Sequence, residues 1–349
     1  MVVPREEALD PGQFLRASRV VIVAGKGGVG KKTVAAALAR MAARLGLTTL
    51  VVQVEQASGL ARLFGRPALT YIESSLAPAA GTIAEVRGRT ITPDDALLEY
   101  LEDHGLRRIS RRLVSTGAMD VVSTAAPGIK DILILGKVKS LERSEAADLI
   151  VVDAPAAGHA ITFLLSARGL LDAVRVGPIN AQARDVLELL TDPARCSVML
   201  VTLAEETPVN EAVETAFTLE DRVGVSLGPV VVNGLYPPLP GLDADPQEAA
   251  QAAGITLGPD EAETLADAAA FRRHRQALQQ AQLDRLDQQL PIPRLGLPFL
   301  FAADLGPAHV DVLAAALRDQ VTALDSPPPP PEPSRSPSPS PSPSPEATA

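Results

Sequence analysis

A glycine-rich loop with three lysines is the part of this sequence whose residue types and spacing best support chemistry. The loop reads Gly25-Lys26-Gly27-Gly28-Val29-Gly30-Lys31-Lys32-Thr33. Glycines let the main chain curve into a nest of N–H groups that approaches phosphate oxygens closely. A helix that starts after the loop adds the positive end of its dipole, and Lys31 would lie against the β- and γ-phosphates. The loop therefore predicts a site for a nucleoside triphosphate.

The choice of lysine strengthens this prediction. The chain has six lysines against 26 arginines, and three of the six lie in the loop. A compact ammonium group fits among phosphate oxygens where a planar guanidinium does not. A glycine-rich turn that binds nothing is the competing interpretation, and it leaves this use of lysine unexplained.

One position departs from the usual phosphate-loop pattern, G-x-x-x-x-G-K-[ST], which places a Mg²⁺-ligating hydroxyl directly after the lysine. Lys32 occupies that position, and Thr33 follows it. One residue further on, Thr33 points about 100° away around a helix and is a poor substitute ligand. Either the Lys32 ammonium replaces part of the metal's charge, or it turns to solvent and the metal keeps fewer protein ligands. ATP binding is expected in both cases, with Mg²⁺ held weakly.

The surrounding pattern predicts elements that can position the loop. Continuous apolar runs are typical of strands that are buried on both faces, and helical Ala- and Leu-rich stretches alternate with them. This alternation predicts an α/β fold with a doubly wound, mostly parallel sheet. The runs are Val20–Ala24, Thr48–Val54, Leu149–Val152, Val198–Val201 and Val230–Val232, and clear helical stretches are Val34–Leu45 and Glu211–Leu219.

The chain divides into three parts by composition. We expect an N-terminal extension over 1–17, a nucleotide-binding domain over 18–325, and a disordered tail over 326–349. The tail holds 11 of the 31 prolines, which cannot support a packed core. A helical insertion is predicted around 60–146, with one capped helix over 92–114. A further helix over 260–289 is expected to pack on the sheet edge or on a partner.

A second candidate segment follows a buried strand, where Asp153 could hold Mg²⁺ through water. The segment Asp153-Ala154-Pro155-Ala156-Ala157-Gly158-His159 resembles switch II of the arsenical pump and tail-anchored-protein targeting ATPases. The glycine-rich loop, with Lys26 ahead of it, resembles the deviant Walker A loop of the same group, the SIMIBI ATPases. Residues 18–320 are thus identified as similar to the ArsA-type P-loop ATPases. For His159, a switch role and a structural role remain open.

The resemblance implies further roles. It implies that Glu55 positions the attacking water, that Asn233 reads adenine, and that Lys26 crosses to the phosphates of a dimer partner. Glu55 as a solvated loop residue and Asn233 as a turn former remain alternatives. The segment Pro127–Asp131 and the loop Leu297–Phe299 also resemble family segments, and we assign no role to them.

Composition excludes several partners. The net charge is −10 and aromatic residues make up 3%, so nucleic acid is not an expected ligand. The single cysteine, Cys196, cannot supply the several soft ligands that arsenite activation needs. The chain has no long apolar run and no signal peptide, so we expect a cytoplasmic protein without stable membrane insertion.

These observations lead to a functional hypothesis with alternatives. The first is an ATP-binding and ATP-hydrolysing dimer, with Lys26, Lys31, Glu55 and Asp153 as catalytic residues, which acts on an unknown partner protein. The dimer could be a homodimer or a heterodimer with a related subunit. The alternative is a nucleotide-binding pseudo-ATPase subunit of a heterodimer, because of Lys32. A positioning ATPase like MinD or ParA is a lesser alternative.

Overall fold

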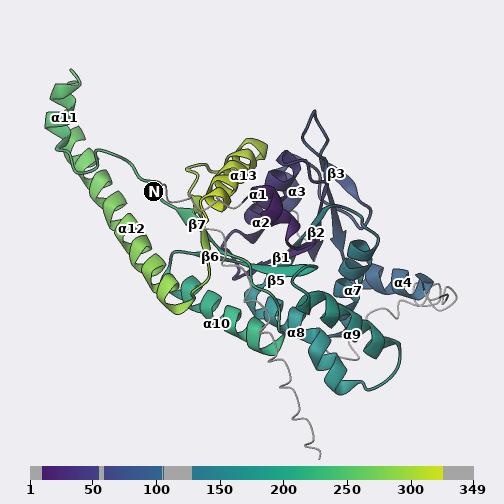
Figure 1. Ribbon diagram of the computed structural model, residues 1–349. Coiled ribbons are helices and arrows are strands. Elements are labelled where there is room, and N and C mark those ends of the chain that lie inside the picture. The colour runs from purple at the N-terminus through teal and green to yellow at the C-terminus, as the bar shows by residue number, and fades with distance from the viewer. Residues whose placement is uncertain (1–9, 55–58, 104, 106–127, 325–349) are drawn as a thin grey trace, which may run out of the picture.

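One eight-stranded sheet forms the centre of the molecule (Figure 1). The computed structural model describes residues 10–54, 59–103, 105 and 128–324. The strand order is β3-β4-β2-β5-β1-β6-β7-β8, and every neighbouring pair is parallel except β3 with β4. The strands are β1 (Val20–Gly25), β2 (Thr49–Val54), β3 (Ser74–Ala77), β4 (Val86–Ile91), β5 (Leu149–Ala156), β6 (Cys196–Leu203), β7 (Val230–Leu235) and β8 (Arg294–Pro298).

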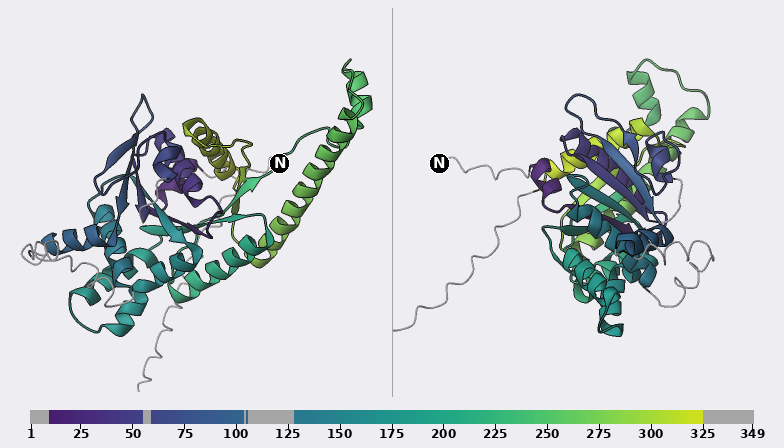
Figure 2. Two further views of the ribbon diagram at one scale, coloured as in Figure 1. Left: turned by 180° about the vertical axis from the view of Figure 1, so that it is seen from behind. Right: turned by 90° about the vertical axis from the view of Figure 1, so that its right-hand side faces the viewer.

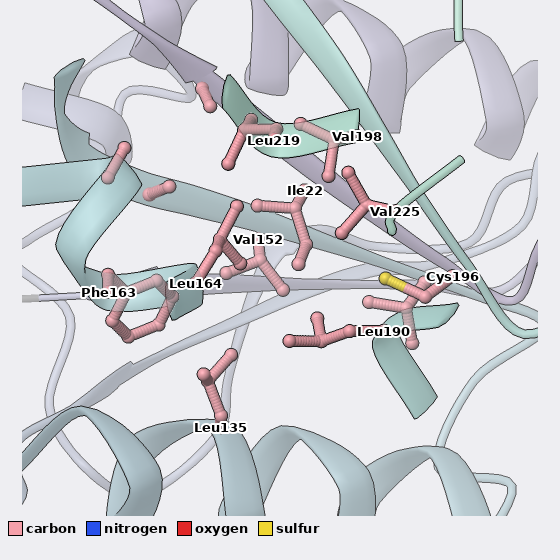
Figure 3. Packing of buried hydrophobic residues seen from close by; sticks show 14 of the residues in the cluster. Ile22, Leu135, Val152, Phe163, Leu164, Leu190, Cys196, Val198, Leu219 and Val225 are labelled. Atoms are coloured by element: carbon pink, nitrogen blue, oxygen red, sulfur yellow. The ribbon is translucent and has the colours of Figure 1, made fainter. Parts of the chain in front are cut away.

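Alternating side chains of the central strands enter two separate cores. In β1, Ile22 packs into the first core and Val23 into the second, because successive side chains of a strand point to opposite faces. Figure 3 shows the first core, where Ile22 and Val152 meet Phe163 and Leu190 from the covering helices. Both faces are therefore covered, which explains why the central strands are continuous apolar runs.

Each core is closed by its own set of helices (Figure 2). The first core is covered by α4 (Pro93–Asp103), α7 (Ile129–Arg143), α8 (Ala157–Ala173), α9 (Pro178–Thr191), α10 (Glu206–Arg222) and the C-terminal part of α12 (Glu261–Gln289). The second core is covered by α1 (Pro11–Arg16), α2 (Lys31–Arg44), α3 (Gly59–Leu63) and α13 (Pro307–Thr322). The expected doubly wound, mostly parallel α/β fold is confirmed.

The five predicted strands are all present, and three more complete the sheet. Two of them, β3 and β4, fall inside the range 60–146, where the sequence analysis expects a helical insertion. The range is therefore not wholly helical: α3, α4 and α7 accompany a hairpin-like edge. β4 carries Arg87, Gly88 and Arg89 in its middle, so it lacks the apolar run by which the central strands were identified.

The two long helical predictions have different outcomes. The first covers 92–114, of which the structure describes α4, ending at Asp103, and Gly105. The second, over 260–289, corresponds closely to α12. The first half of α12 and α11 (Pro246–Ala252) extend away from the body as an arm (Figure 1). Among the described residues, no helix is both long and apolar enough to span a bilayer.

The predicted N-terminal extension and C-terminal tail lie partly or wholly outside the described residues. The expected N-terminal extension over 1–17 contains α1, whose Leu15 is buried in the second core. The predicted tail over 326–349 lies outside the described residues.

Candidate functional site

The glycine-rich loop lies at the carboxyl end of β1, between two parallel neighbours. β1 ends at Gly25, which pairs with Ala156 of β5 and Val201 of β6. The loop occupies residues 26–30, and α2 begins at Lys31. In open α/β sheets, ligands bind in the crevice outside the carboxyl ends of the strands. The predicted order of strand, glycine loop and helix is therefore present.

Gly25, at the end of β1, and Gly30, at the end of the loop, are required by their surroundings. At Gly30, the residue before α2, φ is 92°, and a Cβ atom would lie 2.2 Å from Asn233 Nδ2. At Gly25, φ is 153°, and a Cβ atom would lie 2.2 Å from the Val201 carbonyl oxygen. A side chain at Gly25 would collide with the main chain of β6, and one at Gly30 would be strained by the positive φ and would displace the Asn233 amide. The loop is thus held close to its neighbouring strands, as a nest of phosphate-binding N–H groups requires.

Asn233 takes part in this support. It lies in β7, and its Nδ2 donates a hydrogen bond of 2.9 Å to the carbonyl oxygen of Val29. The predicted adenine-reading role of Asn233 stays a prediction. In the described structure the side chain braces the loop.

Lys31 lies in the first turn of α2 and is directed back over the loop. Its Nζ donates a hydrogen bond of 2.9 Å to the carbonyl oxygen of Lys26. Partial burial lowers the pKa of Lys31, and the neighbouring charge of Lys32 lowers it further, while the carboxylate of Asp153 acts in the opposite direction. A phosphate dianion at this position would supply the negative charge that this half-buried ammonium group favours.

Asp153 lies inside β5 and is 3% exposed. Its neighbours in the sheet are Val23 of β1 and Gln53 of β2. Val152 and Ala154 face the first core, so alternation directs Asp153 to the other face, which α2 covers. The structure thus brings the predicted metal-binding carboxylate to the same side of the sheet as Lys31.

Lys32 turns toward α3. A Cβ atom built on Gly59 would lie 3.4 Å from Lys32 Cδ and 3.8 Å from its Nζ. The side chain is half-buried, and its positive charge acts on Lys31. Its ammonium group therefore lies beside the first residue of α3 and does not extend freely into solvent, and its effect on the Mg²⁺ site stays a prediction.

The fit of ATP and Mg²⁺ can be judged from these groups. The glycine nest and Lys31 suit a triphosphate. For Mg²⁺ the residues offer one buried carboxylate, Asp153, with the half-buried Thr33 in the first turn of α2. Among the described residues, no cluster of three or more His, Cys, Asp or Glu side chains forms a metal site. This donor set suits a metal that keeps most of its waters and is shared with substrate phosphates.

Lys26 is engaged within its own chain. Its Nζ lies 2.6 Å from Oε1 of Glu211 in α10, and both side chains are about one-third exposed: 37% for Lys26 and 36% for Glu211. Glu211 is not among the predicted site residues. It lies 185 positions from Lys26 in a helix with an ordinary amphipathic pattern, so no local signal indicates it.

The structure gives local contacts for two of the three remaining positions. Glu55 lies outside the described residues. His159 is exposed in the first turn of α8, and its carbonyl oxygen accepts a hydrogen bond from Thr162. Phe299, just after β8, stacks on Tyr236 with ring centroids 5.3 Å apart. The roles predicted for Glu55 and His159 stay predictions.

Comparison with known proteins agrees with this geometry. The family model described as anion-transporting ATPase matches residues 18–176. ATPase BagA of Mycobacterium tuberculosis is 37% identical over 242 residues, which cover 67% of this chain and 69% of that protein. The arsenical pump-driving ATPase of Escherichia coli is 27% identical over 210 residues, or 59% of this chain and 33% of that protein. The corresponding ATPase of Acidiphilium multivorum is 28% identical over 210 residues, with the same coverage. With the phosphate loop and the sheet in place, this chain belongs to the ArsA family of anion-transporting ATPases.

Proposed function

We propose that this chain binds ATP at the glycine-rich loop and hydrolyses it with Mg²⁺. The observation that carries the proposal is the joint position of the braced loop, Lys31 at the start of α2, and buried Asp153 on the face that α2 covers. Family membership supports ATPase chemistry in general.

The residues would divide the work by position. The loop N–H groups and Lys31 would hold the phosphates, and Asp153 would hold the metal through water. Mg²⁺, when bound, neutralises charge that develops on the phosphate oxygens. Glu55 would orient the attacking water, because a carboxylate accepts its proton or hydrogen bond. Each of these roles is a proposal for this chain.

We further propose a dimer in which the nucleotide changes the conformation and thereby acts on a partner protein. Lys26 supports this, because it would contact the partner's phosphates after leaving Glu211. The dimer could contain two copies of this chain or one copy with a related subunit. A cytoplasmic location fits this function.

A second candidate is a pseudo-ATPase that binds nucleotide without turnover. Lys32 favours it, because an ammonium group at the usual hydroxyl position removes one Mg²⁺ ligand and adds a like charge beside the metal. The positioning ATPase alternative has less support, since the body is acidic and the Ser-Pro-rich composition of 326–349 is not that of an amphipathic membrane helix.

Two assays separate these functions. The first measures ATP turnover against Mg²⁺ concentration for the natural chain and for Lys32→Thr. The ATPase proposal expects Mg²⁺-dependent turnover in the natural chain. A silent natural chain with an active Lys32→Thr variant would establish the pseudo-ATPase instead.

The second assay measures binding of a fluorescent ATP analogue. Lys31→Ala should abolish binding, since it removes the ammonium group that faces the phosphates. Lys130→Ala, an exposed lysine on α7, is the matched control and should bind normally. Unchanged affinity in Lys31→Ala would place the nucleotide elsewhere and refute the proposed site.

A further inference from the structure

A polar hollow lies between α4, α7 and α9, outside the site described above. Its volume is about 440 Å³, which is within the ~300–1,000 Å³ range of small-molecule sites. The lining includes Lys137, Lys139, Arg143, Ser140 and Gln182, all of which can donate hydrogen bonds. The three helices are neighbours along one side of the molecule (Figure 1).

The hollow has more positive than negative charge. Lys137 Nζ lies 2.5 Å from Glu99 Oε1, and Lys139 Nζ lies 2.8 Å from Asp185 Oδ2. Arg143 shares the same Asp185 oxygen, at 3.5 Å. Three cations therefore share two carboxylates, in a chain whose net charge is −10.

Both lysines are held in place rather than extended into solvent. The side chains of Lys137 and Lys139 are 12% and 10% exposed. Gln182 Oε1 accepts a hydrogen bond of 3.3 Å from Lys139, and Gln182 lies over Gly136, where a side chain on α7 would collide with it. The donors are thus already oriented, which lowers the entropic cost of binding a ligand.

Residue choice provides independent support. The chain's six lysines occur in only two short segments, 26–32 and 130–139, and elsewhere the basic side chains are arginines, of which the chain has 26. The first segment is the phosphate loop. The second segment lies within α7, and two of its three lysines line the hollow. Compact ammonium groups are suited to tetrahedral oxyanions because several can surround one phosphate without a fixed planar geometry.

We propose that this hollow is a second anion site, which binds a tetrahedral oxyanion such as phosphate, free or attached to a small molecule. The surplus cation, Arg143, and the hydroxyl of Ser140 would complete the contacts that Lys137 and Lys139 begin. The site is independent of the nucleotide proposal, because its residues lie on α4, α7 and α9 rather than around the loop.

Calorimetry on the full chain tests this site. The probes are inorganic phosphate, glycerol 3-phosphate and acetate, each compared with chloride at equal ionic strength. Phosphate should bind saturably and acetate at least tenfold more weakly; tighter binding of glycerol 3-phosphate than of phosphate would identify an organic phosphate as the ligand class. Binding must persist in Lys31→Ala, which disables the phosphate loop. Loss of binding in that variant would assign the phosphate to the loop and overturn the proposal.

Two further variants locate the site. Arg143→Ala should weaken phosphate binding at least tenfold, whereas Lys130→Ala, on the same helix outside the lining, should leave it unchanged. Equal losses in the two variants would indicate diffuse attraction and overturn the proposal.

Ser140→Asp places a carboxylate in the hollow. It should raise the melting temperature without phosphate and remove the further rise that phosphate causes in the natural chain. A lowered melting temperature with phosphate binding retained would refute the site.

Discussion

Lys31 and Lys32 are adjacent ammonium groups, and their mutual repulsion has a measurable consequence. The pKa of Lys31 is lowered first by burial and then by Lys32. As pH rises through that lowered pKa, Lys31 loses its charge and ATP binding should weaken. The weakening should begin at a lower pH than it would if Lys31 had the ordinary lysine pKa of about 10.4.

Removing the like charge reverses part of this effect. In Lys32→Thr the pKa of Lys31 should rise, and the alkaline loss of ATP affinity should move to higher pH. A fluorescent ATP analogue titrated from about pH 7 to pH 10.5 measures it, with Lys130→Thr as the control. Superimposable pH profiles for the natural chain and Lys32→Thr would contradict the interpretation.

The ion pair between Lys26 and Glu211 leads to a second prediction. If Lys26 serves a partner's nucleotide, Glu211 competes for it within the free chain. Glu211→Gln should therefore strengthen ATP-dependent self-association, by about 1.4- to fivefold, because partly exposed pairs contribute only ~0.2–1 kcal/mol. Sedimentation velocity with ATP measures this.

Glu214→Gln, which lies one turn further along the exposed face of α10, is the matched control. Unchanged or weaker association in Glu211→Gln would remove the proposed competition.

The site residues differ in how far the sequence could predict them. The loop was predictable because its chemistry is contiguous, and Asp153 because strand alternation determines its face. The partner of Lys26 was not, since no local pattern relates position 26 to position 211. Asn233 was identified from the family resemblance, but its contact with Val29 depends on how β7 lies beside the loop.

At the level of elements, predictability follows burial. The central strands β1, β2, β5, β6 and β7 are continuous apolar runs and were predicted. β3 and β8 lie at the sheet edges and are short, and the apolar pattern of β4 is interrupted by Arg87, Gly88 and Arg89. Helix α12 was predicted in full, but its sequence did not show that its buried residues all lie in the C-terminal half.

Gln279 anchors α12 to the sheet. It is 5% exposed, accepts a hydrogen bond of 2.9 Å from the Tyr236 amide, and donates one of 3.0 Å to the Gly234 carbonyl oxygen. Gln279→Ala leaves both main-chain groups without this partner. An unsatisfied buried polar group lowers the free energy of unfolding by about 1–3 kcal/mol. We expect the free energy of unfolding to fall by at least that amount in denaturant titrations.

The adjacent Gln280→Ala is the control. Gln280 is exposed and bonds only to Asp284 among the hydrogen bonds described for it, so its loss should cost no more than about 0.5 kcal/mol. Similar costs for the two variants would mean that the anchor contributes little.

For the whole molecule, the two cores around one sheet imply a single cooperative unit, while the arm of α11 and the first half of α12 stands outside it. Helix α12 buries only Gln279, Leu283 and Leu286, all in its C-terminal half. The arm should therefore open locally at little cost, whereas the centre of the sheet should open only with global unfolding.

Cys196 can report that global opening, because it is the only cysteine and is fully buried in the first core (Figure 3). Burial raises the pKa of its thiol to about 12. The unfolded thiol ionises near its ordinary pKa of about 8.5, so the contribution of Cys196 to stability is complete below that pH and is lost as pH rises toward 12.

A thiol reagent such as Ellman's reagent should consequently label Cys196 only through unfolding. If ATP binds the folded state and not the unfolded state, labelling should slow by the factor 1 + [ATP]/Kd, which is about 100-fold at an ATP concentration of 100 times the Kd. The Lys31→Ala variant should show no such slowing, since its phosphate site is disabled. Rapid labelling at a rate independent of both denaturant and ATP concentration would show that the first core opens locally. It would contradict a single cooperative unit built on this sheet.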